Sequence, residues 1–239
     1  MTTLISKRLY NTILWDIRLQ FRNGFYYAAA VVGVMAVLLL SQLPKETLAW
    51  ALPILVLGNL LMNGFYFVSG LVLLEKGEGT LEAQIVTPLR NQEYLFAKVA
   101  TLTALSLLEN MTIVALTYGF GPYLFKVLVG LLLAAPLYTL FGFVVVVRYD
   151  AVNEFLLPSI VFASLLSLPM ITYLGANLSW PIFLHPLEGS LLWLTAAFQP
   201  VPGWQLSLSL LYSAAWIGIG AVVARRAFYR FVVVREGVR

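Results

Sequence analysis

Residues 124–147, LFKVLVGLLLAAPLYTLFGFVVVV, form a continuous apolar stretch in which Lys126 is the single charge. A transmembrane α-helix needs about 20 consecutive, mostly apolar residues. The stretch does not alternate polar and apolar side chains, as a strand of an outer-membrane barrel would. It therefore predicts a membrane-spanning helix and an all-α integral membrane fold.

The composition of the whole chain agrees with that class. Of its 239 residues 61% are hydrophobic and 11% are charged, and the mean hydropathy is +0.88. A soluble domain carries about 25% charged residues, and disordered chains are rich in charge. The net charge of +4 is distributed around apolar blocks, which argues against nucleic-acid binding. With no cysteine and one histidine, a disulfide framework, a Cys nucleophile and a thiolate or His-rich metal site are excluded.

Five further stretches resemble the first, so six transmembrane helices are predicted within a single transmembrane domain over residues 1–239. Lys and Arg are enriched on the cytoplasmic side of membrane proteins. Thirteen of the fifteen fall on the side that holds both termini, and two fall on the other. We therefore expect both termini to be cytoplasmic. The predicted spans are residues 25–43, 48–74, 95–120, 124–147, 155–174 and 206–224.

Two segments are not expected to cross the membrane. Residues 1–24 have apolar side chains near helical spacing, with Lys7, Asp16 and Arg18 as polar positions, which predicts an amphipathic interfacial helix on the cytoplasmic surface. Residues 177–204 form an outer segment that is apolar but broken by prolines. Residues 188–198 could form a short re-entrant helix there. A seventh span is the alternative, but it would place the C-terminal arginines outside, against the charge rule.

The connection between the second and third spans, residues 75–88, reads EKGEGTLEAQIVTP. Gly77 and Gly79 break the preceding span, Thr80 is suited to cap a new helix, and Pro88 ends that helix. The pattern predicts a short cytoplasmic helix with one apolar face and an acidic end. From the residues alone it is either a connecting loop or a docking surface for a cytoplasmic partner.

This segment resembles the coupling helix of ABC-2 type ABC transporter permease subunits. The matching residues are Glu75, Lys76, Gly79, Thr80, Leu81, Glu82, Val86, Thr87, Pro88, Tyr94 and Lys98. The resemblance implies that residues 75–94 form the coupling-helix region, which docks on a separate ATPase subunit. The implied ATPase-docking residues are Glu75, Lys76, Gly79, Thr80, Leu81, Glu82, Ile85, Thr87 and Pro88.

The resemblance extends beyond this motif. The loop 148–154 before Pro158 looks like the family's second cytoplasmic contact, and His185-Pro186-Leu187 lies where that family often has a Pro-Leu pair. Glu78 and Ala83 depart from the commoner pattern. The compact size resembles the permeases of drug or antibiotic export, including those grouped with fluoroquinolone exporters.

The chain has no G-x-x-x-x-G-K-[ST] loop to hold ATP phosphates. The resemblance implies a transport subunit that is not an enzyme, with no cofactor of its own and with ATP and Mg on the partner ATPase. It implies a half-transporter that needs a second permease subunit, identical or not, in the cytoplasmic membrane of a prokaryote. The implied partners are thus the ATPase, the second permease and the lipid bilayer, without nucleic acid.

Polar side chains inside the predicted spans are candidates for a translocation path. A charge such as Glu109 in the third span is costly and by default functional, and the amides of the second and third spans follow helical faces. The alternative is that they form hydrogen bonds between helices of one bundle. A cationic amphiphile would suit a path with one carboxylate. The candidates are Asn59, Asn63, Tyr66, Ser106, Glu109 and Asn110.

Other functions stay open as alternatives. A stand-alone secondary transporter or channel would show inverted repeats and several intramembrane charges, and neither is visible. A membrane enzyme would need a cluster of His, Asp or Glu near one membrane face. A metal site on Glu75, Glu78 and Glu82 is disfavoured because glycines interrupt the helix between them. A non-transporting membrane anchor is harder to exclude.

Overall fold

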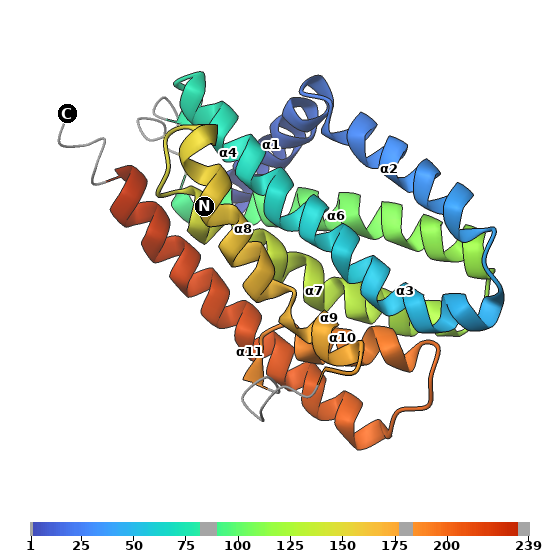
Figure 1. The fold of residues 1–239 in the computed structure, drawn as a ribbon. Helices are drawn as coiled ribbons and strands as arrows, with labels where there is room; N and C mark the ends of the chain where they lie inside the picture. The colour runs from blue at the N-terminus through green and yellow to red at the C-terminus, as the bar shows by residue number, and fades with distance from the viewer. Residues whose placement is uncertain (1, 82–89, 177–183, 234–239) are drawn as a thin grey trace.

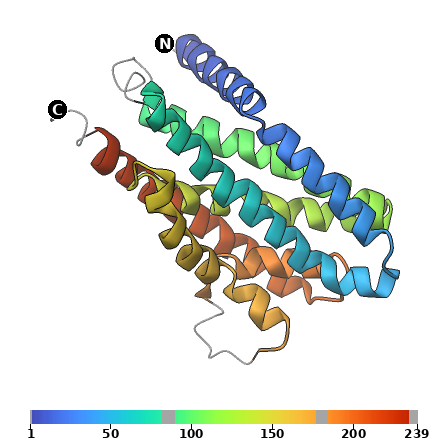
Figure 2. The same ribbon diagram turned by 45° about the horizontal axis from the view of Figure 1, so that its top comes forward.

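The computed structural model describes residues 2–81, 90–176 and 184–233, and within these ranges the regular structure is helical (Figures 1 and 2). The all-α prediction is therefore confirmed. The helices, including two π-helical segments, are α1 (Thr2–Arg22), α2 (Phe25–Leu40), α3 (Lys45–Leu60), η1 (Leu61–Tyr66), α4 (Phe67–Gly77), α6 (Asn91–Tyr118), α7 (Tyr123–Val146), α8 (Val152–Leu166), α9 (Leu168–Tyr173), α10 (Glu188–Ala196), α11 (Gly203–Phe228) and η3 (Tyr229–Val233).

Within the described ranges, four helices are long and apolar enough to cross a membrane: Lys45–Gly77, Gln92–Tyr118, Tyr123–Val146 and Gly203–Val232. A fifth is added if α1 and α2, which meet at a bend of 63°, are counted as one broken span. The four helices coincide with the predicted second, third, fourth and sixth spans. The predicted first and fifth spans lie on shorter helices, α2 with 16 residues and α8 with 15.

The predicted fifth span, residues 155–174, is wrong as one continuous helix. It is divided at Ser167 into α8 and α9. Pro169 lies in the first turn of α9. Proline lacks the backbone N–H that would continue a helix, and its ring clashes with the preceding turn. A hydropathy pattern does not detect this break, because Pro169 is surrounded by apolar residues on both sides.

The core of the bundle lies around α7, which packs against α6, α10 and α11. In its most apolar stretch 78% of α7 is buried, compared with 17% of α11, so α7 is central and α11 peripheral. Close packing between η1 and α7 depends on glycine. A Cβ at Gly64 would lie 2.6 Å from Tyr138 Cβ, and one at Gly142 would lie 2.6 Å from the Phe65 carbonyl oxygen. Such small residues allow helices to approach closely in a membrane.

The N-terminal helix α1 packs against α6 and turns into α2 at Gly24, whose φ of +83° suits glycine. One expectation for this helix is wrong. Asp16 does not lie on the polar face, since it is 5% exposed and turned into the bundle, whereas Trp15 is 61% exposed. The reason is a buried partner, Lys98 on α6.

The segments predicted to be cytoplasmic meet at one end of the bundle (Figures 1 and 2). Arg8 of α1 lies 3.7 Å from Glu93 of α6, Lys76 of α4 lies 3.2 Å from Asp150 of the α7–α8 loop, and the Arg148 guanidinium lies over the Phe231 ring. At the other end, α10 lies where the sequence predicts a short helix within residues 188–198, and it packs against α7 and α11.

Candidate functional site

Glu109 on α6 lies at the centre of a polar cluster inside the bundle. Its Oε1 accepts a hydrogen bond from Asn59 Nδ2 at 3.0 Å, and its Oε2 accepts one from Asn63 Nδ2. Asn59 Nδ2 also lies 3.3 Å from Asn110 Oδ1. Glu109 is 7% exposed. Four of the six predicted path residues are thus brought together, from two segments about 50 residues apart in the sequence.

The helix that faces α6 positions the two amides. Asn59 lies near the end of α3 and Asn63 in η1, four residues later. Residues at this spacing share one helix face, so both amides reach one carboxylate. Single π-turns often mark functional positions in helices.

The other two predicted path residues have different surroundings. The Ser106 carbonyl oxygen accepts a hydrogen bond from Asn110 Nδ2 at 2.9 Å, so Ser106 touches the cluster through its backbone. The Tyr66 ring packs edge-to-face on Phe65. Among the described residues, no hydrogen bond joins the Tyr66 side chain to Glu109 or the amides.

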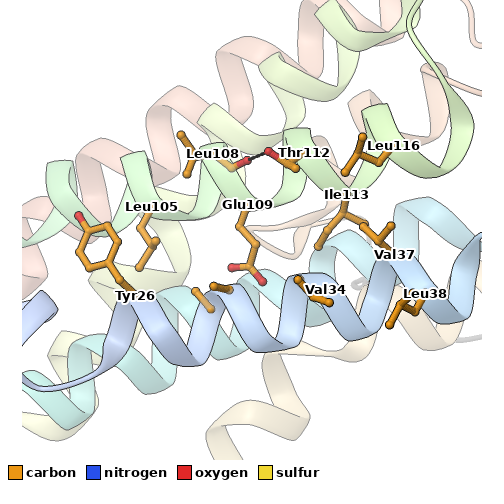
Figure 3. A pocket seen from close by; sticks show the side chains of 13 residues that line it. Tyr26, Val34, Val37, Leu38, Leu105, Leu108, Glu109, Thr112, Ile113 and Leu116 are labelled. Carbon is orange, nitrogen blue, oxygen red and sulfur yellow. Dashed lines mark hydrogen bonds between the residues drawn. The ribbon is translucent and has the colours of Figure 1, made fainter.

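A cavity of about 420 Å³ adjoins the carboxylate between α2 and α6. Figure 3 shows Glu109 extending from α6 toward α2, with Tyr26 at one end of the cavity and Leu38 and Leu116 at the other. The Thr112 hydroxyl donates to the Leu108 carbonyl oxygen at 2.7 Å. Apart from Glu109, Thr112 and the Tyr26 phenol, the lining side chains are apolar. The lining residues are Tyr26, Ala29, Ala30, Gly33, Val34, Val37, Leu38, Leu105, Leu108, Glu109, Thr112, Ile113 and Leu116.

A second buried polar cluster lies at the end of the bundle where α1, α4 and α6 meet. The Lys98 ammonium pairs with Asp16 of α1 and with Glu75 Oε1 of α4, the latter at 2.6 Å. Lys98 is 1% exposed. The Tyr94 hydroxyl donates to Glu75 Oε2 at 2.5 Å, and the Thr101 hydroxyl donates to Asp16 Oδ2 at 2.5 Å. Charges buried this deeply need partners of this kind.

This second cluster, the Lys98 cluster, consists of Asp16, Glu75, Tyr94, Lys98 and Thr101. It was not predicted from the sequence. The available signal was Asp16 and Gln20, polar residues four apart near the apolar face of an amphipathic helix. Gln20 Nε2 donates to Asp16 Oδ2 at 2.8 Å. A buried lysine at the start of a span was a second signal, because it requires an acidic partner.

Of the predicted docking residues, Glu75 and Lys76 lie at the end of α4 and Gly79 in the turn after it, and Thr80 and Leu81 are helical residues that follow the turn. Lys76 Nζ donates to the carbonyl oxygens of Val147 at 2.8 Å and Tyr149 at 2.7 Å. Gly79 has a φ of +66°, and the Thr80 hydroxyl donates to the Glu75 carbonyl oxygen at 3.1 Å. Leu81, like Glu75, is buried. Glu82, Ile85, Thr87 and Pro88 lie outside the described residues, and docking itself stays a prediction.

His185, in the outer segment, is held as a neutral side chain. Its Nε2 lies 3.1 Å from the Leu165 carbonyl oxygen, and its Nδ1 accepts a hydrogen bond from the Leu187 backbone N–H at 3.2 Å. Burial lowers the pKa of the imidazole to about 4, against a smaller opposite effect of the hydrogen bond to Leu165. The ring thus links the end of α8 to the start of α10.

The geometry can be compared with known proteins. Fluoroquinolones export permease proteins of Mycobacterium tuberculosis strains CDC 1551 / Oshkosh and ATCC 25618 / H37Rv are each 32% identical to this chain over 237 residues. The match covers 97% of this chain and 99% of each relative. A model of the fluoroquinolones export permease protein family matches residues 7–236. The chain therefore belongs to the fluoroquinolones export permease family, a family of membrane transport proteins.

Proposed function

We propose that this chain is the membrane-spanning permease subunit of an ATP-driven ABC-2 type exporter. It would form half of the translocation path and couple to a separate ATPase through the helix within residues 75–88. In this proposal α2 and the α8–α9 pair complete six spans. Both termini and the coupling helix face the cytoplasm, and α1 lies along the membrane surface.

The observation that carries the proposal is that the first two residues of this segment, Glu75 and Lys76, are each held by contacts with other helices or loops. On one side Glu75 is held by Lys98 and Tyr94, and through Lys98 by Asp16 of α1. On the other side Lys76 is held by the α7–α8 loop. A loop that merely connects two spans needs no such anchors. A docking element that must transmit movement from a partner to several helices does need them.

These contacts also suggest different roles for the predicted docking residues. Glu75 and Leu81 are buried, so in this proposal they hold the segment in place. The contact surface for the ATPase comes from the later residues, with Glu82 as the acidic contact. A charge reversal at a polar interface opposes association, so this assignment is open to a direct test.

The proposed source of energy is a separate ATPase subunit. The chain lacks a phosphate-binding P-loop, so ATP and its Mg²⁺ would be bound by the partner subunit. A second permease copy or a paralogue would complete the path. The names of the relatives refer to fluoroquinolones export, and this supports a drug-like, amphiphilic small molecule as the cargo.

The test is a mild-detergent pull-down of the full chain from its native membranes, with identification of the proteins that accompany it. We expect a stoichiometric ATP-binding subunit. Glu82→Arg is expected to lose that subunit while the purified permease keeps its thermal unfolding midpoint. Glu46→Arg, an exposed acidic position in the first turn of α3, is the matched control and should retain it.

Two outcomes would contradict the proposal. If no ATPase accompanies the folded wild-type chain, even after cross-linking, a stand-alone carrier or a membrane anchor becomes the better interpretation. If Glu82→Arg retains the ATPase and transports normally, the docking surface is assigned to the wrong residues.

A further inference from the structure

We propose that the groove between α2 and α6 binds a lipophilic cation, with the Glu109 carboxylate as its counter-ion (Figure 3). The inference rests on the proposed function and deepens it, because it names the chemical class of the cargo and the place where this chain would hold it.

The Glu109 carboxylate is held by two neutral amides, Asn59 and Asn63. Within residues 2–81, 90–176 and 184–233, the ion pairs join other residues, and none includes Glu109. A buried carboxylate in a membrane protein normally pairs with a cation or faces a water-filled path. Glu109 therefore lacks a positive partner that a ligand could supply.

The walls of the cavity favour an apolar ligand. The cavity beside Glu109 has about 420 Å³, within the usual range of roughly 300–1,000 Å³ for small-molecule sites. Because its walls are almost entirely apolar, a strongly hydrated cation would lose its water without replacement. A cation carried on an apolar frame meets both requirements. An anion is disfavoured by the carboxylate.

Helix α2 presents small residues opposite the carboxylate. The facing positions are the small residues Ala29, Ala30 and Gly33. A Cβ built on Gly33 would lie 3.4 Å from Glu109 Cγ and 3.7 Å from Oε1. The carboxylate therefore lies over bare backbone, and a long side chain at position 33 would fill the groove without altering its charge.

A second copy of this chain is the rival occupant of the groove. Helix α2, FYYAAAVVGVMAVLLL, carries no charged residue, so the α2 of another copy would bring no cation to Glu109. Lipid acyl chains bring none either. Charge complementarity thus favours a cationic ligand over both alternatives.

The experiment measures binding of tetraphenylphosphonium to the full chain in lipid nanodiscs by equilibrium dialysis, after subtraction of binding to empty nanodiscs. Tetraphenylborate, which has the same shape and the opposite charge, is the ligand control. We expect saturable binding of the phosphonium alone. We expect at least tenfold weaker binding in Glu109→Gln and in Gly33→Leu. Binding should be unchanged in Glu46→Gln and in Gly218→Leu, which makes the same change at a glycine of α11 where a Cβ would meet no atom within 4 Å.

The inference is overturned if Glu109→Gln binds the phosphonium as well as the wild type, or if phosphonium and borate saturate equally. If Glu109→Gln does not fold, the comparison of Gly33→Leu with Gly218→Leu decides. The natural chain has no cysteine, so oxidation of Val34→Cys tests the rival occupant. Disulfide-linked dimers that block phosphonium binding would show a second copy in the groove.

Binding to nanodiscs needs no ATPase, so the two proposals fail separately. If an ATPase accompanies the chain but phosphonium binding does not depend on Glu109, the cation site is refuted and the ABC proposal is kept. Glu109-dependent binding without any ATPase would leave the site and remove the ABC mechanism.

Discussion

The Lys98 cluster and the polar cluster of Asn59, Asn63, Glu109 and Asn110 both include residues of α6, but they hold their buried carboxylates in different ways. At the end of the bundle, Lys98 supplies an ammonium between Asp16 and Glu75. Among the described residues, the hydrogen-bond partners of the Glu109 carboxylate are the amides of Asn59 and Asn63. Lys98 and Glu109 are about three turns, roughly 16 Å, apart along α6, so they lie on nearly the same face. The first cluster joins α1, α4 and α6 into one unit, and the second leaves a negative charge beside a cavity.

The two clusters therefore differ in role. The charges of the Lys98 cluster stabilise the packing of helices, whereas the Glu109 carboxylate could pair with a ligand. A charge whose partner is built into the fold holds helices in place, and its removal leaves the partner uncompensated. A charge held only by amides does not depend on another charge for its place.

Lys98→Met removes the ammonium and leaves Asp16 and Glu75 as buried carboxylates. We expect the free energy of unfolding to fall by about 3–5 kcal/mol, measured by denaturant unfolding in detergent. The triple variant, with Asp16→Asn and Glu75→Gln added, is the control and should recover most of the loss. A single variant as stable as the wild type would contradict the structural role of the cluster.

Asn63→Ala removes the amide that donates to Glu109 Oε2. A buried acceptor without its partner costs about 1–3 kcal/mol, so a smaller loss of unfolding free energy is expected than for Lys98→Met. Tyr66→Phe, three residues further along the same segment, is the matched control and should change stability by less than about 0.5 kcal/mol. Equal losses in both variants would show that the loss in Asn63→Ala is not specific to its hydrogen bond with Glu109.

Glu109→Gln keeps the shape of the side chain and leaves no cation unpaired among the described residues. Gln keeps one acceptor oxygen for the two amides, so one buried donor loses its partner and we expect a loss of about 1–3 kcal/mol in unfolding free energy. Ligand binding is expected to be strongly reduced. The same denaturant titration measures the loss of stability. A loss as large as that of Lys98→Met would mean that Glu109, like Lys98, is a charge on which the stability of the fold depends.

His185 is a half-buried titratable group that, like Glu109, is held by hydrogen bonds to uncharged partners. Its folded pKa, about 4, lies below its unfolded value of 6.5. Between these values the unfolded chain binds the proton and the folded chain does not, so stability falls as the pH falls from 6.5 toward 4. We expect the difference in thermal midpoint between the wild type and His185→Ala to shrink from pH 7 to pH 5. A constant difference would show that the imidazole titrates alike in both states.

Much of the fold and part of the site could be predicted from local pattern. The apolar stretches predict the helices because a membrane helix satisfies its own backbone within one segment. The turn at Gly79 follows from the backbone freedom of glycine. The spacing of four residues places Asn59 and Asn63 on one helix face. The division at Ser167 could not be predicted, because Pro169 changes backbone geometry without changing hydropathy.

By itself, the sequence determined that this is an all-α membrane protein, with a segment similar to a coupling helix and with amides and one carboxylate inside its spans. Only the tertiary structure decided which of these groups meet. Asp16 and Lys98 are 82 residues apart, and Glu109 lies 46 residues from Asn63. Helical periodicity assigns a side chain to a face, but pairing depends on how faces pack. That packing is set by contacts between helices, such as those of Gly64 and Gly142 with α7 and η1, which no local pattern records.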